Sequence, residues 1–235
     1  MPDPAPEWLV IASRAVNRIG GFGIAIPLLI GLWRWKYLTP PAKALVWYFA
    51  FWTVEAPINL WSRKVLHTNI YLHHLDVLVE TWLLGWMYYR AFGLGRLQRW
   101  LPVMGVAFTL LALADATVLA GLNQPNAYAR LGQTLLMLSV IILYFDHYMQ
   151  RISVNYHSWD DTVFRVSIGL AIYYAGSITG YIFFKLTDDL MIVRTAGLLI
   201  DSLFLVALVL MTWAISRDRR DAIDSMPRAL AKAAT

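Results

Sequence analysis

Apolar residues gather in seven runs along the chain, and short polar stretches separate the runs. A helix that crosses a membrane needs about 20 mostly apolar residues, and each run reaches that length. The pattern therefore predicts an all-α bundle of seven transmembrane helices over residues 1–216, with no separate soluble domain and with a basic tail over 217–235. The predicted helices cover about residues 9–34, 42–62, 69–90, 99–121, 127–149, 161–184 and 190–215.

Composition agrees with this pattern. Of the 235 residues, 59% are hydrophobic and 15% are charged, whereas soluble domains have about 45–50% apolar and about 25% charged residues. This excludes soluble globular, disordered and fibrous proteins and leaves the lipid bilayer as the main partner. The absence of cysteine excludes disulfides, thiolate metal ligands and cysteine nucleophiles. The net charge of +5 does not indicate a nucleic-acid partner, because the basic residues lie mostly at the ends of apolar runs.

The distribution of basic residues predicts the orientation. Cytoplasmic loops of membrane proteins are enriched in Lys and Arg. The loops after the first and third predicted helices and the C-terminal tail are the more basic set, so we expect the N-terminus outside and the C-terminus in the cytoplasm, in a plasma (inner) membrane. The basic residues of that set are Arg34, Lys36, Lys43, Arg90, Arg96, Arg99, Arg217, Arg219, Arg220, Arg228 and Lys232.

Several polar and ionisable residues fall inside the predicted helices. A charged group at membrane depth costs about 2.5–3.5 kcal/mol, so each needs a partner or a function. With the predicted orientation they all lie in the outer half of the bundle, and we expect them to form a ligand-binding site. The candidate residues are Glu55, Asn69, His73, His74, Asp76, Glu80, Asp115, Arg130, Tyr174, Arg194 and Asp201.

Helical spacing places some of these residues on shared faces. His73, Asp76 and Glu80 follow an i, i+3, i+7 pattern, and Arg194 and Asp201 are seven apart. A bundle that turns these faces to one axis would form a polar cavity open to the outside, with aromatic side chains as an apolar floor. Packing is the alternative, since buried carboxylates can also pair with Arg130 or Arg194 simply to hold helices together.

Metal and retinal sites place specific demands on residue type and spacing. His74, Glu80 and Asp201 have donor types that zinc accepts, but a recognised metal-binding spacing is lacking. A retinal chromophore needs a Schiff-base lysine in the last helix, and residues 189–216 contain no lysine. We therefore predict no cofactor, keep zinc as an open alternative and assign no catalytic residue.

The second and third predicted helices carry a pattern that resembles a group of small bacterial seven-helix membrane proteins of unknown function. The pattern is Glu55 followed by Asn69-x-Tyr-Leu-His-His74-Leu-Asp-x-x-x-Glu80. The resemblance covers about 40 residues and implies a seven-helix bundle with an outward polar site at Asn69, His74 and Glu80. Asp76 departs from the group's pattern, and the resemblance implies no activity.

The leading interpretation is a receptor- or sensor-like membrane protein that binds a small polar or cationic ligand from outside. Signalling would then need a separate cytoplasmic partner protein, because the chain has no recognisable output domain. Two alternatives stay open: an ion- or proton-coupled small-molecule transporter, and a metal-dependent membrane hydrolase that acts on lipid. The sequence leans away from an enzyme without excluding one.

Overall fold

The computed structural model is all-helical over the residues that it describes, which are 6–93, 96–152, 162–186 and 189–218. The helices are α1 (Glu7–Gly23), α2 (Ala25–Trp33), a 3₁₀ turn (Trp35–Tyr37), α3 (Pro40–Val65), α4 (Ile70–Phe92), α5 (Arg96–Ala114), a π-helical turn (Asp115–Leu119), α6 (Ala127–Ile152), α7 (Thr162–Leu186) and α8 (Leu190–Arg217). Each of the seven predicted segments is therefore helical, with the first segment formed by α1 and α2 together. Four segments are long and apolar enough to cross a membrane: Glu7–Trp33, Leu97–Leu119, Ala127–Gln150 and Met191–Arg217.

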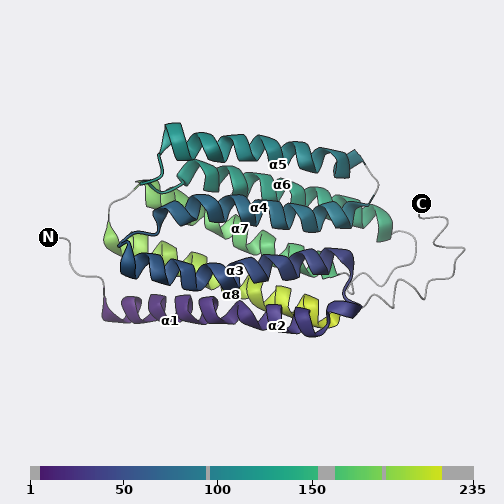
Figure 1. Cartoon of the computed structure of the whole chain (residues 1–235), viewed down its shortest axis with the longest axis horizontal. Coiled ribbons are helices and arrows are strands. Elements are labelled where there is room, and N and C mark those ends of the chain that lie inside the picture. Colours follow the sequence, from purple (N-terminus) through teal and green to yellow (C-terminus); the bar gives the residue numbers. More distant parts are fainter. Residues whose placement is uncertain (1–5, 94–95, 153–161, 187–188, 219–235) are drawn as a thin grey trace, which may run out of the picture.

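The helices run up and down in one bundle (Figure 1). Helices α3, α5 and α7 finish, and α4, α6 and α8 begin, at the end where α1 begins, which we call the α1 end. Helices α2, α4 and α6 finish, and α3, α5 and α7 begin, at the opposite end, where α8 finishes, which we call the α8 end.

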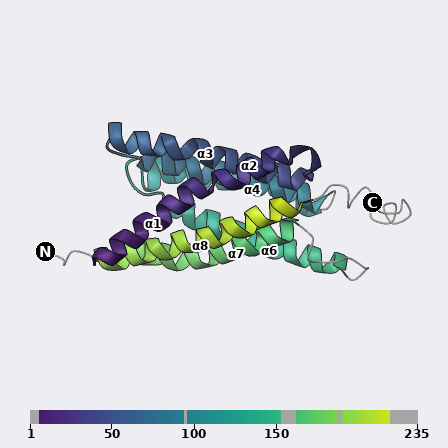
Figure 2. The same ribbon diagram turned by 90° about the horizontal axis from the view of Figure 1, so that it is seen from below.

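The first segment bends between α1 and α2, and Figure 2 shows α1 lying obliquely to the helices beneath it. Pro27 is the third residue of α2 and cannot donate a backbone hydrogen bond to the preceding turn. Proline is a common cause of a sharp helix bend. The bend lets one segment contact both α3 and α8.

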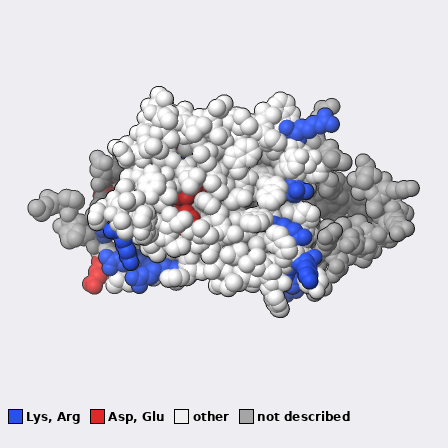
Figure 3. Space-filling view, viewed as in Figure 1, with Lys and Arg blue, Asp and Glu red and all other residues white. Residues whose placement is uncertain are grey.

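The exterior of the bundle is apolar. Phe22, Trp33 and Val118 are 79%, 86% and 81% exposed, and in Figure 3 a wide band without Lys or Arg, with one small patch of Asp or Glu, separates the basic side chains at the two ends of the face. A soluble protein rarely exposes so large an apolar surface. Lipid is the solvent that this exterior fits.

Close helix packing between α7 and α8 depends on small residues. A Cβ on Gly169 would lie 3.2 Å from the Ala207 Cα, and a Cβ on Gly176 or Gly180 would overlap Leu203 or Ile200. Small residues let helix backbones approach in membranes, where helix association depends on packing. The Gly176–Gly180 stretch, which also contains Ser177, is therefore a packing surface.

A buried carboxylate joins three segments at the α8 end. Asp218 accepts hydrogen bonds from the Thr39 backbone N–H at 2.7 Å, the Thr39 hydroxyl at 3.1 Å and the Thr162 hydroxyl at 2.6 Å. Its backbone carbonyl accepts from Arg34 at 2.7 Å. The bundle therefore extends through Asp218, two residues beyond the predicted boundary at 216, and the rest of the predicted tail, 219–235, lies outside the described residues.

Candidate functional site

The predicted site residues lie mainly in the half of the bundle nearer the α1 end. The helices alternate in direction, so the C-terminal half of α3 and α5 and the N-terminal half of α4, α6 and α8 share that half (Figure 1). Tyr174 lies at the middle of α7. The structure divides these residues into two main groups and a few separate positions.

The first group is a buried network around Glu80, which is 2% exposed. Arg130 Nη1 donates to Glu80 Oε2 at 3.1 Å, and the Tyr174 hydroxyl donates to Oε1 at 3.1 Å. Arg130 Nη1 also donates to Gln133 Oε1 at 3.2 Å. This Glu80–Arg130–Tyr174 network joins α4, α6 and α7.

The sequence interpretation missed one member of this network. Tyr48 on α3 is 1% exposed and makes a side-chain hydrogen bond with Glu80. Tyr48 and Glu55 are seven residues apart and so share a face of α3, which is the signal that could have found it. Tyr48 adds an α3 side chain beside the Glu80 carboxylate, whose two oxygens are already paired with Arg130 and Tyr174, and the Arg130 side chain stays 15% exposed.

The second group lies between α3 and α4, closer to the α1 end, and we call it the α3–α4 polar cluster. Its members are Glu55, Asn59, Arg63, Asn69, His73 and Asp76. The Asn59 amide donates to Glu55 Oε1 at 2.7 Å, and His73 Nδ1 lies 3.4 Å from Asp76 Oδ2.

Asn69 links the two helices of this cluster. Its side-chain amide lies 3.2 Å from Asn59 Oδ1 and 3.2 Å from His73 Nε2. It also lies 3.1 Å from the Arg63 guanidinium. Glu55 interacts electrostatically with Asp76, His73 and Arg63, so the two carboxylates of the cluster affect each other.

The α3–α4 polar cluster is less completely satisfied than the Glu80–Arg130–Tyr174 network. Asp76 is 1% exposed, yet its Oδ1 has no hydrogen-bond partner. His73, which contacts the other oxygen, has a 37% exposed side chain. A buried polar atom without a partner is costly and is rare in native proteins. Asp76 Oδ1 can therefore accept a donor from a bound molecule.

Two further predicted residues hold the α5–α6 connection. His74 Nε2 lies 3.1 Å from the Gln124 carbonyl oxygen, and the Asn126 amide donates to the His73 carbonyl at 2.6 Å. Asp115 Oδ2 accepts from the Ala129 backbone N–H at 2.9 Å, in the first turn of α6. Backbone N–H groups in the first turn of a helix have no intrahelical acceptor, and the Asp115 carboxylate supplies one for Ala129. These contacts give His74 and Asp115 a structural role at the α5–α6 connection, although His74 Nδ1 and Asp115 Oδ1, like Asp76 Oδ1, are buried without a hydrogen-bond partner.

The last two predicted residues lie apart from both groups. Asp201 is half-buried on α8, and its side chain makes a hydrogen bond with Asn17 on α1. Arg194 is half-buried one to two turns earlier on α8, and no described carboxylate forms an ion pair with it. The predicted shared face of Arg194 and Asp201 therefore does not join the polar groups on α3, α4 and α6.

The described residues contain no group of three or more His, Asp or Glu side chains arranged to hold a metal ion. His74, Glu80 and Asp201, the possible ligands, have the separate contacts described above. Their donor types fit zinc, but their positions in the fold do not.

Comparisons of the chain with protein-family models, with curated proteins and with solved structures found no match.

Proposed function

We propose that the chain is a receptor- or sensor-like protein of the plasma (inner) membrane that binds a small polar or cationic ligand at the α3–α4 polar cluster. The observation that carries the proposal is Asp76, which is 1% exposed and keeps one carboxylate oxygen without a partner. Glu55 adds a second carboxylate nearby. His73, whose side chain is 37% exposed, contacts the other Asp76 oxygen.

The proposal includes the membrane topology. All seven segments would span the bilayer, with the α1 end outside and the α8 end in the cytoplasm. The up-and-down order of the helices supports this (Figure 1), and so does the greater number of basic residues in the connections at the α8 end. The α3–α4 polar cluster then opens to the outer side.

The chemistry of the cluster favours a cationic ligand. Glu55 and Asp76 supply two carboxylates, and only Arg63 is a permanent cation among the cluster's members. A ligand ammonium group could donate to Asp76 Oδ1 and to Glu55 together. Charge-assisted hydrogen bonds of this kind are about twice as strong as neutral ones.

The Glu80–Arg130–Tyr174 network would transmit binding to the rest of the bundle. Glu80 follows Asp76 by one helical turn on α4. A shift of α4 on ligand binding would therefore change the hydrogen bonds of Glu80 with Arg130 on α6 and with Tyr174 on α7. Helix shifts of about 1–2 Å are a common form of such coupling. A separate cytoplasmic protein would bind the bundle and respond to these shifts.

A transporter and a metal-dependent lipid hydrolase are the alternative functions. No observation in the described residues favours either one over a receptor. Uptake of the ligand into sealed vesicles would identify a transporter, and stoichiometric zinc with lipid hydrolysis would identify the hydrolase.

The experiment is a thermal-shift titration of the purified protein with putrescine, choline and ethanolamine as cationic probes and acetate as an anionic one. Glu55→Gln/Asp76→Asn is the test variant, and Glu7→Gln/Asp189→Asn is its charge-matched control with two exposed carboxylates. A ligand at 100 times its Kd stabilises the folded state by about 2.7 kcal/mol.

We expect at least one cationic probe to raise the unfolding temperature of the wild type and the control but not of the test variant. Equal responses of the wild type and the test variant to every probe would contradict the proposal.

A further inference from the structure

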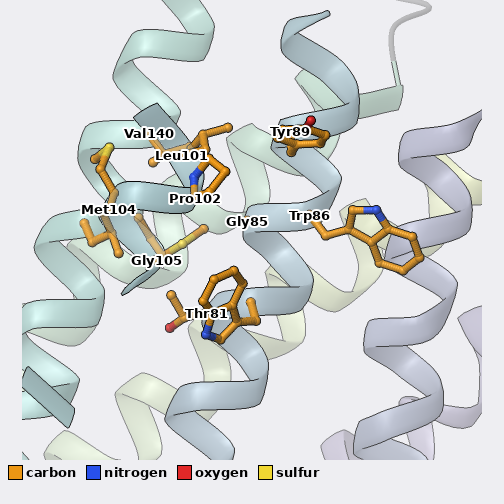
Figure 4. Close-up of a pocket in the computed structure, with 12 residues that line it drawn as sticks. Thr81, Gly85, Trp86, Tyr89, Leu101, Pro102, Met104, Gly105 and Val140 are labelled. Carbon is orange, nitrogen blue, oxygen red and sulfur yellow. The ribbon is translucent and has the colours of Figure 1, made fainter. Parts of the chain in front are cut away.

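A second site is formed by an apolar groove on the exterior of the bundle, between α4 and α5 (Figure 4). The hollow measures about 270 Å³. Gly85 of α4 faces Pro102 and Gly105 of α5 across it, Val140 of α6 contributes to its wall, and Trp86 borders it with a ring directed to the other side of α4. It is separate from the α3–α4 polar cluster, and the inference below does not depend on the proposed function.

The groove opens to the surroundings of the bundle. Trp82 and Trp86, which line it, are 43% and 38% exposed. Two polar groups in its wall are paired within the protein, because the Trp82 Nε1–H donates to the Thr109 hydroxyl at 3.0 Å and the Thr81 hydroxyl donates to the Val77 carbonyl at 2.7 Å. The groove therefore offers a mainly apolar surface to lipid.

One end of the groove carries positive charge. Tyr89 lines that end and is followed by Arg90, whose guanidinium lies 5.9 Å from the centre of the Trp86 ring. Arg99 lies in the first turn of α5, two residues before the lining residue Leu101, and so on a different face of the helix near the same end of the groove. Both arginines are exposed, and neither forms an ion pair with a described carboxylate. Two long basic side chains thus flank the α8 end of the groove, one from α4 and one from α5, and side chains of this length can extend past their own helix face.

We propose that this groove binds an anionic glycerophospholipid, with an acyl chain along Gly85 and Gly105 and the phosphate at Arg90 and Arg99. The size of the hollow favours a chain, because a helix with its side chains is about 10–12 Å across and does not fit. The charge at one end favours an anionic headgroup, since arginine forms paired hydrogen bonds with phosphate. A zwitterionic lipid would fill the apolar part equally well but gain less at the arginines.

The experiment measures lipid binding to the detergent-purified full chain by native mass spectrometry. The probes are phosphatidylglycerol and phosphatidylcholine with identical acyl chains. Each basic residue near a membrane surface contributes about 1 kcal/mol of attraction to anionic lipid, so we expect the wild type to bind phosphatidylglycerol at least about tenfold more tightly.

Two variants separate the parts of the site. Arg90→Gln/Arg99→Gln should bind the two lipids equally. Lys36→Gln/Arg217→Gln removes two exposed cations at the same end of the bundle, on other helices, and should keep the preference. Gly85→Leu should weaken the binding of both lipids, because the leucine side chain would fill part of the groove. A Cβ at Gly85 meets no atom within 4 Å, so the substitution causes no clash at that carbon.

Three results would overturn the proposal. The first is equal binding of the two lipids to the wild type. The second is equal loss of preference in Arg90→Gln/Arg99→Gln and Lys36→Gln/Arg217→Gln, which would indicate a general charge effect. The third is a dimer that forms without lipid and is abolished by Gly85→Leu, which would make a second copy of the chain the occupant.

Discussion

The Glu80–Arg130–Tyr174 network and the α3–α4 polar cluster use similar residues within the same half of the bundle, but they differ in how completely their polar atoms are paired. Both Glu80 oxygens have partners, and the acid is matched by a guanidinium. In the α3–α4 polar cluster, the carboxylates of Glu55 and Asp76 interact electrostatically, and Asp76 Oδ1 has no partner. The first arrangement is complete without a ligand, whereas the second leaves an acceptor available.

This difference gives a physical criterion for separating a structural polar group from a binding site. Removing one partner of a buried ion pair leaves an uncompensated charge and is strongly destabilising. Neutralising an acid that lacks partners relieves part of a desolvation cost. Substitution of the acid should therefore cost much more stability at Glu80 than at Asp76.

The largest effect is expected at Glu80. Glu80→Ala leaves Arg130 buried without its acidic partner, so we expect it to lower the free energy of unfolding by about 3–5 kcal/mol. Chemical denaturation in mild detergent, followed by circular dichroism, measures this. A loss below about 1 kcal/mol would show that Glu80 is not the centre of a structural network.

Tyr174→Phe should have an intermediate effect. The substitution removes one hydrogen bond to an ionised carboxylate, which is worth about 1.5–3 kcal/mol. Tyr37→Phe is the matched control, because Tyr37 is 56% exposed and its change should cost less than about 0.5 kcal/mol. Equal losses in the two variants would contradict the assignment of Tyr174 to the network.

Asp76→Asn should have the smallest effect on stability. Asparagine has nearly the same shape and loses a charge that is only partly compensated, so we expect the free energy of unfolding to change by less than about 1 kcal/mol. The same denaturation experiment measures it. A loss as large as that of Glu80→Ala would make Asp76 a structural residue and remove the contrast between the two groups.

Much of the fold was predictable from the sequence because hydrophobic run length determines where helices form in a membrane protein. The seven helical segments follow directly from it. The alternating direction of the helices places four predicted residues in the same half of the bundle: Glu55, Asp76, Glu80 and Arg130. The pairing of Glu80 with Arg130 follows from the need of a buried charge for a partner.

Helix rotation explains most of what the sequence could not predict. The sequence pattern places Asp201 in the same half of the bundle as the other acids, but its side chain makes a hydrogen bond with Asn17 on α1. Rotation also determines that Tyr48 reaches Glu80. The contact of His74 with the Gln124 carbonyl depends on the course of the α5–α6 connection, which hydrophobic periodicity does not describe.

The central claim is that the α3–α4 polar cluster is open to the outer side of the membrane and selects cations. The chain has no cysteine, so a single His73→Cys substitution provides a unique thiol beside Asp76. The rates at which this thiol reacts with a positively charged and a negatively charged membrane-impermeant methanethiosulfonate reagent are measured on intact cells. The measurement is made on the single variant and on the same variant with Glu55→Gln/Asp76→Asn added. Thr68→Cys, at an exposed position of the α3–α4 connection, is the reference for the intrinsic reactivity of the two reagents.

Our account predicts that Cys at position 73 reacts from outside, that its preference for the positive reagent exceeds the reference by about tenfold, and that the double substitution abolishes the excess. A thiol at that position that neither reagent reaches from outside, or one with the same preference as the reference, would contradict it.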